Sequence, residues 1–428
     1  MRRLLTAALI TAVTAGLTVA AVPASTAATK TVDRGPTTTL VGAKTGLAGS
    51  RDLAYAGGRL YALDDAAVRV FAPGASGNAT PQRTIDLDLP SGQHSWSIAV
   101  GDDGTTYVLT SNDELTSSTI FIYAAGASGA AGHVSVVNGV LGLMSPIDIA
   151  ERDGGFAVLD NDSNAIFFYS QSGGGAPVEV GGIDAGSGTQ TQIFGPSTID
   201  TAPDGRLVVR GADWVSVFAA DADGDVAPTQ YLQGDQTMIG VPLGAGLDTR
   251  GDLYLATADA YGADPGHARV LRFDPGATGN VAPVGVLTGA RTGLGLPYLE
   301  VLPSGSVATA TFETATYTFD GTIRFFRPIG PYAAPGAARL EVTGKKSAPR
   351  RTISWKAAPT DADVPVTSYA VKVTCRGKVR LDRTLKASVR RAVVKLGPVR
   401  KGSCTATVRA RNEVGLGTVA KAKFAVRR

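Results

Sequence analysis

The sequence has few of the residues on which metal-dependent and disulfide-rich proteins rely. It contains 2 cysteines, 3 histidines and 3 tryptophans in 428 residues. Both cysteines lie near the C-terminus, so disulfides cannot support the large N-terminal part. A catalytic zinc site normally needs three convergent ligands. His133 is expected near an outer strand, away from His94 and His267, which argues against a three-histidine zinc centre.

Two further features are missing, a nucleophile motif and a long apolar run in the expected mature chain. No Gly-x-Ser-x-Gly sequence is present, so there is no nucleophile elbow of the hydrolase type. No apolar run after residue 28 reaches the length of a membrane span. The one long apolar run follows Met1-Arg2-Arg3 and ends at small residues, which predicts a secretory signal peptide over residues 1–28. We therefore expect a secreted protein, extracellular or associated with the cell envelope, and an uncleaved membrane anchor is the alternative.

Charged residues make up only 18% of the chain, but their signs are separated. Residues 339–428 contain 23 Lys and Arg against 5 Asp and Glu, a net charge of +18. Residues 29–338 contain 16 Lys and Arg against 32 Asp and Glu, a net charge of −16. The C-terminal part should therefore adhere to polyanions, while the N-terminal part should repel them.

A short glycine-rich segment recurs along the N-terminal part. Residues 71–78 read FAPGASGN, residues 123–130 read YAAGASGA, and residues 273–280 read FDPGATGN. Altered copies lie at residues 169–175 and 218–225. Recurrence at a long, regular period indicates a repeat architecture.

The repeats have a second marker, a glycine turn between two apolar runs. The turn glycines at positions 58, 104, 154, 205, 251 and 305 are 46, 50, 51, 46 and 54 residues apart. Asp-Gly between alternating apolar runs is a hairpin signal, and four strands in a unit of this length are typical of a propeller blade. The pattern predicts an all-β, six-bladed β-propeller over residues 29–330. Residues 35–40 resemble a fourth strand, so the N-terminus is expected to complete the last blade.

These units resemble the NHL-type six-bladed propellers of secreted bacterial proteins, which are related in form to lactonase and peptidyl-amidating-lyase propellers. The Asp-Gly turns, the stretch DNDSN at residues 160–164 and the Phe-Ala-Pro-Gly repeats carry the resemblance. It implies a fold more than an activity, because one scaffold serves many functions.

After a Pro/Gly linker at residues 331–338, the period disappears. Residues 339–428 resemble a basic fibronectin type III domain, a β-sandwich, through Trp355, Tyr369 and the signature VRARNEVG at residues 408–415. Cys404 stands where that family usually has tyrosine, and Cys375 ends the strand expected beside it. This implies a Cys375–Cys404 disulfide in an exported chain. A metal site or a reactive thiol is the alternative.

Two acidic runs alternate like calcium ligands. Asp160, Asp162 and Asn164 form one, and Asp221, Asp223 and Asp225 form the other. Neither has the distant bidentate Glu of a calcium loop. We interpret the first as a turn whose side chains cap their own backbone and the second as an ordinary turn of the repeat, with calcium as the alternative for both.

The lactonase-type relatives imply a divalent-metal site at the propeller axis. Glu300 is interpreted as the one Glu on an inner strand, and Asp148, Asp200 and Asp248 as residues at comparable positions in their repeats. That recurrence favours a structural role, so we predict no cofactor, with one divalent metal, calcium, at the axis as the alternative. An axis lined by Ala, Thr and Val would favour a binding protein over an enzyme.

The loops expected on one propeller face supply the candidate ligand-binding residues. These are Asp64, His94, Trp96, Asp113, Asp160, Asn164, Asp213, Trp214, Asp259, Tyr261, His267 and Glu300. Candidate polyanion-binding residues in the basic module are Arg376, Lys378, Arg380, Arg390, Arg391, Arg400 and Lys401. Interleaved aromatic residues are nearly absent from this module, which argues against nucleic acid as the partner.

The sequence thus predicts a secreted, non-enzymatic binding or adhesion protein. Its propeller would recognise a carbohydrate or a peptide, and its basic module would associate with an anionic cell-surface polymer or polysaccharide. The alternative is a secreted hydrolase or lyase of the propeller class, acting on a lactone or a glycan. Fibronectin type III modules accompany extracellular polysaccharide-degrading enzymes, but that association supplies no mechanism.

Overall fold

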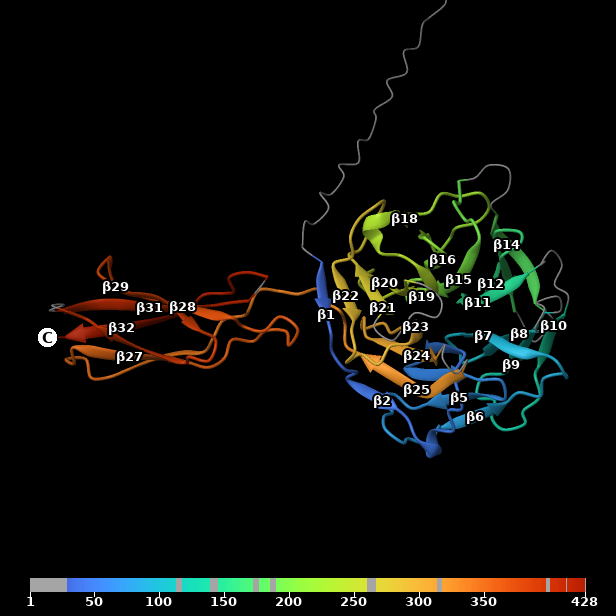
Figure 1. The fold of residues 1–428 in the computed structure, drawn as a ribbon, viewed down its shortest axis with the longest axis horizontal. Helices are drawn as coiled ribbons and strands as arrows, with labels where there is room; N and C mark the ends of the chain where they lie inside the picture. The colour runs from blue at the N-terminus through green and yellow to red at the C-terminus, as the bar shows by residue number, and fades with distance from the viewer. Residues whose placement is uncertain are drawn as a thin grey trace, which may run out of the picture.

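The computed structural model describes residues 29–112, 118–138, 145–171, 177–184, 190–259, 267–313, 318–397, 401–412 and 414–427. The expected signal peptide lies outside these ranges. The described chain is all-β, as predicted: its strands form eight sheets, joined by turns and two short 3-10 helices, η1 (Ala43–Thr45) and η2 (Asp235–Thr237) (Figure 1). Within these ranges, no helix has the length and apolar character needed to cross a bilayer.

Six sheets, numbered here in chain order, precede the C-terminal module. Sheet one contains β3 (Asp52–Ala56), β4 (Arg59–Leu63), β5 (Ala67–Phe71) and β6 (Arg83–Asp86). Sheet two contains β7 (His94–Val100), β8 (Thr106–Ser111), β9 (Ser118–Tyr123) and β10 (Ser135–Asn138). Sheet three contains β11 (Pro146–Arg152), β12 (Gly155–Asp160), β13 (Ala165–Ser170) and β14 (Val178–Asp184).

The next three sheets continue the same antiparallel order. Sheet four contains β15 (Pro196–Thr201), β16 (Leu207–Gly211), β17 (Trp214–Phe218) and β18 (Gln230–Gln233). Sheet five contains β19 (Val241–Leu247), β20 (Leu253–Ala258), β21 (Arg269–Phe273), β22 (Gly285–Thr288) and the N-terminal β1 (Lys30–Val32). Sheet six contains β23 (Leu296–Val301), β24 (Val307–Glu313), β25 (Thr318–Phe326) and β2 (Thr38–Leu40).

The N-terminal segment joins the last two of these sheets. β2 pairs with β25 and forms the outermost strand of sheet six, which confirms the role predicted for residues 35–40. β1 adds a fifth strand to sheet five, parallel to β22. These two strands cover the edges of β22 and β25, and they hold together residues far apart in the sequence.

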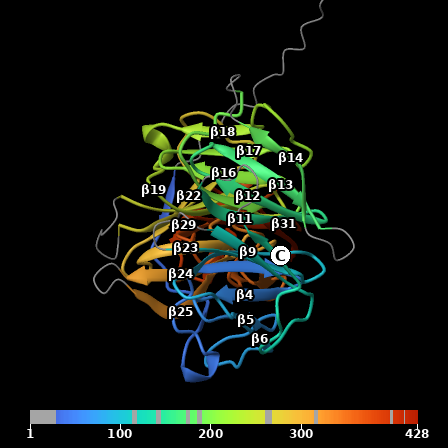
Figure 2. The same ribbon diagram turned by 90° about the vertical axis from the view of Figure 1, so that its right-hand side faces the viewer.

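The first strands of the six sheets touch one another in chain order. β3 contacts β7, and the contacts continue through β11, β15, β19 and β23, which contacts β3 in turn. Six hydrophobic clusters lie between consecutive sheets, and one of them, around Leu53 and Ala308, joins sheet six to sheet one. Viewed from the side, the β16–β18 group and the β4–β6 group lie at opposite ends of this part of the molecule (Figure 2).

The recurrent glycine segment explains how neighbouring sheets are held together at their outer edges. Gly77 has a φ of 61°, which favours glycine, and it exchanges backbone hydrogen bonds with Thr39 and Val41 at the end of β2. Gly129 and Gly279 make equivalent bridges to β6 and β18. The copies at Gly77, Gly129 and Gly279 thus fasten their sheets to the outermost strand of the preceding one.

The C-terminal module is a two-sheet sandwich that extends away from the six sheets (Figure 1). One sheet contains β26 (Leu340–Thr343), β27 (Arg350–Trp355) and β30 (Arg391–Lys395). The other contains β28 (Ser368–Cys375), β29 (Lys378–Lys386), β31 (Lys401–Arg411) and β32 (Ala420–Arg427). Trp355 and Tyr369 pack in its core, and the predicted Cys375–Cys404 disulfide is present between β28 and β31.

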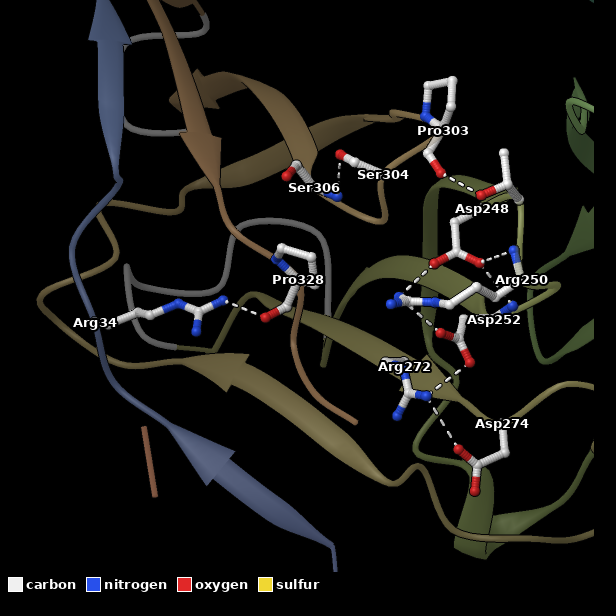
Figure 3. A network of polar contacts seen from close by, with 11 residues as sticks. Arg34, Asp248, Arg250, Asp252, Arg272, Asp274, Pro303, Ser304, Ser306 and Pro328 are labelled. Atoms are coloured by element: carbon white, nitrogen blue, oxygen red, sulfur yellow. Dashed lines mark hydrogen bonds and ion pairs between the residues drawn. The ribbon is translucent and has the colours of Figure 1, made fainter. Parts of the chain in front are cut away.

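An ionic contact holds the module against the rest of the chain. Asp363 of the module pairs with Arg34, which follows β1, and with Arg327, which follows β25, the latter at 2.6 Å. Arg34 also donates to the backbone carbonyl of Pro328 at 3.1 Å (Figure 3). The carboxylate is buried between two guanidinium groups from opposite ends of the N-terminal part.

Candidate functional site

A large cavity is bordered by the first strands of all six N-terminal sheets. Its volume is about 1220 Å³, and β3, β7, β11, β15, β19 and β23 each contribute to its wall. Nine carboxylates and two guanidinium groups line it: Asp52, Asp102, Asp148, Glu151, Asp153, Asp200, Asp204, Asp221 and Glu300, with Arg51 and Arg152. The wall therefore carries many carboxylates, and these lie among Ala, Thr and Val residues such as Ala54, Thr198 and Val301.

Two of these carboxylates link the first strands to one another. Asp52 accepts hydrogen bonds from the backbone N–H of Leu53 at 2.8 Å and from that of Ile98, on the next sheet, at 2.9 Å. Asp148 accepts likewise from Ile149 at 2.9 Å and from Ile199 on sheet four at 2.8 Å. These bonds give both residues a structural role in joining sheets.

Ser97 takes the corresponding place on β7. Its hydroxyl donates to Asp148 and accepts a hydrogen bond from the N–H of Ile149 at 3.3 Å. Three successive sheet junctions thus use one position, occupied by Asp52, Ser97 and Asp148.

Four buried carboxylates on the cavity wall, Asp52, Asp148, Asp200 and Glu300, hold their protons more tightly than usual. Burial raises the pKa of Asp52 to about 6. Burial, with the nearby Asp52 charge, raises the pKa of Asp148 to about 8. Burial raises the pKa of Asp200 to about 7, and burial together with the charges of Asp200 and Asp52 raises the pKa of Glu300 well above its ordinary value. Near neutral pH, several of these groups therefore exchange protons readily.

A further carboxylate of the cavity wall, Glu151, also has a raised pKa. Burial and the neighbouring charges of Asp102, Asp153 and Asp103 raise the pKa of Glu151 to about 7. Glu151 is on β11, so the expectation that Glu300 is the one Glu on a first strand was wrong. Among the described residues, no three His, Cys, Asp or Glu side chains gather closely enough to hold a metal ion.

The expected equivalence of Asp148, Asp200 and Asp248 was also wrong. Asp148 lies opposite Leu159 in its hairpin, and the residue at that position in sheet four is Thr198, opposite Arg210. Asp200 lies two residues further along, level with Glu300. Asp248 follows β19 and lies outside the cavity wall.

Asp248 belongs to a chain of ion pairs around the turn after β19 (Figure 3). Arg250 contacts Asp248 at 2.6 Å and Asp252 at 2.9 Å. Arg272 on β21 then joins Asp252 at 2.6 Å to Asp274 at 3.1 Å. These alternating charges fix the β19–β20 turn against β21, which is a structural function.

Several residues predicted to bind a ligand instead hold turns. Asp64 is buried and accepts hydrogen bonds from the N–H groups of Ala66 and Ala67, both at 2.9 Å. Asp160 is buried and accepts from the N–H of Ser163 at 2.9 Å and from its hydroxyl at 2.7 Å.

Three more members of the two acidic runs, Asn164, Asp223 and Asp225, also accept backbone hydrogen bonds. Asn164 accepts one from Gly195 at 2.7 Å. Asp223 and Asp225 accept from Gly182 and Gln190, at 2.9 and 2.8 Å. Both runs are therefore hydrogen-bonded turns.

Other predicted residues are divided between the surface and the core. Trp96 is 39% exposed and lines the cavity, as Glu300 does. His94 lies 3.6 Å from Asp65. Trp214 is only 2% exposed and donates its ring N–H to the carbonyl of Phe194 at 2.8 Å, so its ring belongs to the core rather than to a ligand-facing loop.

Three more predicted residues lie at the surface, and two lie outside the described ranges. His267 contacts Asp259 at 3.1 Å, and Asp213 accepts a hydrogen bond from Gln233 at 3.1 Å. Asp113 and Tyr261 are the two that fall outside the described residues. Of the residues predicted to bind a ligand, Trp96 and Glu300 both lie on the cavity wall.

The basic residues predicted to bind polyanions are spread over the C-terminal module. Arg376 lies in the β28–β29 turn, and Lys378 and Arg380 follow on β29. Arg390 lies 4.8 Å from the centre of the Tyr369 ring, Arg391 is on the opposite sheet and Lys401 begins β31. Arg400 lies outside the described residues.

The structure gathers a second basic set, which shares Lys401 with the predicted one, on one face of the four-stranded sheet. We call it the cationic ridge: Lys401, Arg409, Arg411, Lys421, Lys423 and Arg427. The period-two alternation of β31 and β32 carries this signal in the sequence, because every second residue there faces away from the core.

Comparison with known proteins gives distant matches in structure alone. No protein-family model and no curated protein matches the sequence. A protein of unknown function from Bacteroides caccae is 10% identical with a TM-score of 0.39, covering 56% of this chain and 85% of its own. A chain of a nidogen/laminin complex is 15% identical with a TM-score of 0.37, covering 63% and 93%.

A third match is the extracellular domain of a one-component system from B. thetaiotaomicron. It is 10% identical with a TM-score of 0.36, covering 92% of this chain and 59% of its own. Likeness at this level assigns no activity.

Proposed function

We propose that this chain is a secreted binding protein, in which an NHL-like six-bladed propeller recognises a ligand and a fibronectin type III module adheres to an anionic cell-envelope polymer. The contacts of the first strands, which run from β3 to β23 and back to β3, support the propeller. Hydrophobic clusters between consecutive sheets support it too. The Cys375–Cys404 disulfide supports export to an oxidising compartment.

The observation that carries the adhesive function is the unbalanced charge of the module. Its net charge is +18, and the side chains of β31 and β32 that face away from the core include six exposed or partly exposed basic groups and no carboxylate within residues 401–411 and 420–427. Such a surface concentrates polyanions near it.

The cavity suits a ligand with many hydrogen-bond donors. Carboxylates accept hydrogen bonds from sugar hydroxyls and from amines, and Trp96 offers an aromatic face at the rim. This favours a carbohydrate or a peptide bearing amino groups as the propeller ligand.

The test is retention of the full mature chain on immobilised polymers. We expect retention at low salt on an anionic polymer and none on neutral dextran, with elution as the salt concentration rises. Passage through the anionic column at low salt would contradict adhesion.

A second candidate is a hydrolase or lyase of the propeller class. The observation that favours it is the pKa of about 7 for both Asp200 and Glu151, which suits proton transfer at neutral pH. Turnover of a lactone or glycan by the purified protein, abolished in Asp200→Asn or Glu151→Gln, would support this function.

A further inference from the structure

We infer that the cationic ridge is the polymer-binding surface of the module, and that it takes an extended phosphate-containing polymer without bases. This inference rests on the proposed adhesive function. It adds the surface, the binding mode and the chemical class of the partner.

The register of β31 separates two faces. Cys404, Ala406, Val408 and Ala410 are buried in the sandwich core. The alternate residues face away from the core, and they are Lys401, Ser403, Thr405, Thr407, Arg409 and Arg411. One side of the strand is thus apolar, and the other consists of basic and hydroxyl side chains.

β32 extends the same surface sideways. Lys421 pairs with Thr407, Lys423 with Thr405, and Arg427 with Lys401. Each ridge lysine of β32 therefore lies beside a threonine of β31, and Arg427 beside Lys401. Arg409 is held in place by a hydrogen bond from its Nε to the carbonyl of Gly417, at 3.0 Å.

The shape of the ridge fits a linear molecule better than a compact anion. β31 has 11 residues. At a rise of about 3.3 Å per residue the ridge is roughly 33 Å long, and side chains on one face recur about every 6.6 Å. Between the basic groups lie only the small side chains of Ser403, Thr405, Thr407 and Ala425, so a polymer can lie flat along it.

The positive charge of the ridge is not neutralised by the described acidic residues of the same sheet face. Asp382, on the far edge strand β29, is the acidic residue of this face in the described part of the sheet. It contacts Lys372 at 3.2 Å, so its charge is directed to a lysine outside the ridge.

The donor set points to phosphate. Arg and Lys together with Ser and Thr hydroxyls are the side chains that contact phosphate oxygens in nucleic-acid complexes. Base recognition in single strands additionally needs aromatic platforms. Phe424, the aromatic residue of β32, is on the core side, opposite Cys404, so the described outer face offers no such platform.

The experiment measures binding of the full mature chain to labelled linear polyphosphate, to alginate as a carboxylate polymer, and to neutral dextran. The ridge variant is Lys421→Gln/Lys423→Gln/Arg427→Gln. Its matched control is Arg350→Gln/Arg391→Gln/Lys395→Gln on the opposite sheet, which removes the same charge. We expect polyphosphate affinity to fall about 100-fold in the ridge variant, since a basic group facing an anionic surface contributes roughly a fivefold factor, and by less than about fivefold in the control.

The outcomes separate this inference from the proposed function. Failure of the unaltered chain to bind either anionic polymer would contradict adhesion itself. Polyphosphate binding that falls equally in both variants would overturn the ridge, and equal or tighter ridge-dependent binding of alginate would overturn the phosphate assignment. Lys421→Arg/Lys423→Arg preserves the charge and must retain binding, which distinguishes lost contacts from lost folding.

Discussion

The side-chain oxygen of Asn78 accepts a hydrogen bond from the backbone N–H of Lys44, at 2.7 Å. Asn78 belongs to sheet one, whereas Lys44 lies in η1, just after the outermost strand of sheet six. Asn280 makes the same bond to Gln236 in η2 at 2.8 Å, and Asp225 makes one to Gln190. In these three copies, the last residue of the recurrent segment thus accepts a backbone hydrogen bond from the residues that follow the outermost strand of the preceding sheet.

Replacing Asn78 should weaken the junction that closes the series of six sheets. Asn78→Ala leaves the N–H of Lys44 without this partner, and we expect a loss of about 1 kcal/mol in the free energy of unfolding. Denaturant unfolding measures it. Ser76→Ala, in the same exposed turn, should change stability by less than about 0.5 kcal/mol, and an equal loss in both variants would contradict the role of Asn78.

Stability should depend on pH through Asp200. The pKa of Asp200 is about 7 in the folded chain against an ordinary 3.8, so the folded state binds the proton more tightly than the unfolded state does. Its contribution is therefore present below the ordinary pKa and is lost as pH rises toward 7. Asp200→Asn should unfold at a higher temperature than the unaltered chain at about pH 8, and the gain should disappear at about pH 4.

The increase in the free energy of unfolding caused by Asp200→Asn has an upper limit of about 4 kcal/mol, because each pKa unit corresponds to about 1.4 kcal/mol. Asp88→Asn, which removes the same charge from an exposed site, is the control and should show no such difference. A gain independent of pH would exclude proton linkage as the cause.

The contact of Asp363 with Arg34 and Arg327 should control how firmly the module is docked. Asp363→Asn removes the negative charge that both guanidinium groups share. Breaking a buried ion pair costs about 3–5 kcal/mol, and the partial exposure of Arg327 lowers this figure. We expect faster proteolysis within residues 331–338, while Asp382→Asn, at an exposed pair with Lys372, should leave the cleavage rate unchanged.

Reducing the disulfide should destabilise the module alone. Cys375 and Cys404 are separated by 29 residues, and closing a loop of this size stabilises a domain by roughly 3–4 kcal/mol in the chain-entropy model. Calorimetry should show the module transition shifted to lower temperature by reductant, with the transition of the six sheets unchanged. A shift of both would indicate that they unfold as one unit.

Much of the strand pattern could be predicted because the turn chemistry repeats. Asp-Gly turns located the hairpins, and the likeness of residues 35–40 to a fourth strand located β2. β1 gave no such signal, since Lys30–Val32 is only 3 residues long and pairs with a strand more than 250 residues away.

The cavity was harder to predict because register depends on turn length. In sheet three Arg152 pairs with Gly155 across a two-residue turn, whereas in sheet four Thr201 pairs with Leu207. Because the turns differ in length, Asp148 and Asp200 occupy positions two residues apart in their strands. Asp52 was missed because the same position holds Ser97 in sheet two, so no single residue type recurs there.

The alternation of Lys401–Arg411 carries the sequence signal for the cationic ridge, but the residues predicted from charge density share only Lys401 with it. Density along the sequence does not distinguish the two faces of a strand. The pairing of β31 with β32 is what brings Lys421 and Lys423 beside the same row.

The most direct test of the account is the salt dependence of polyphosphate binding by the full mature chain. Counterion release predicts that the logarithm of the association constant falls linearly with the logarithm of the salt concentration. We expect a slope of about −4 to −5 for six ridge charges at about 0.7 per contact, and a slope shallower by about 2 in Lys421→Gln/Lys423→Gln/Arg427→Gln. An affinity that does not change with salt, or a slope unaffected by these substitutions, would contradict a cationic ridge that binds anionic polymers.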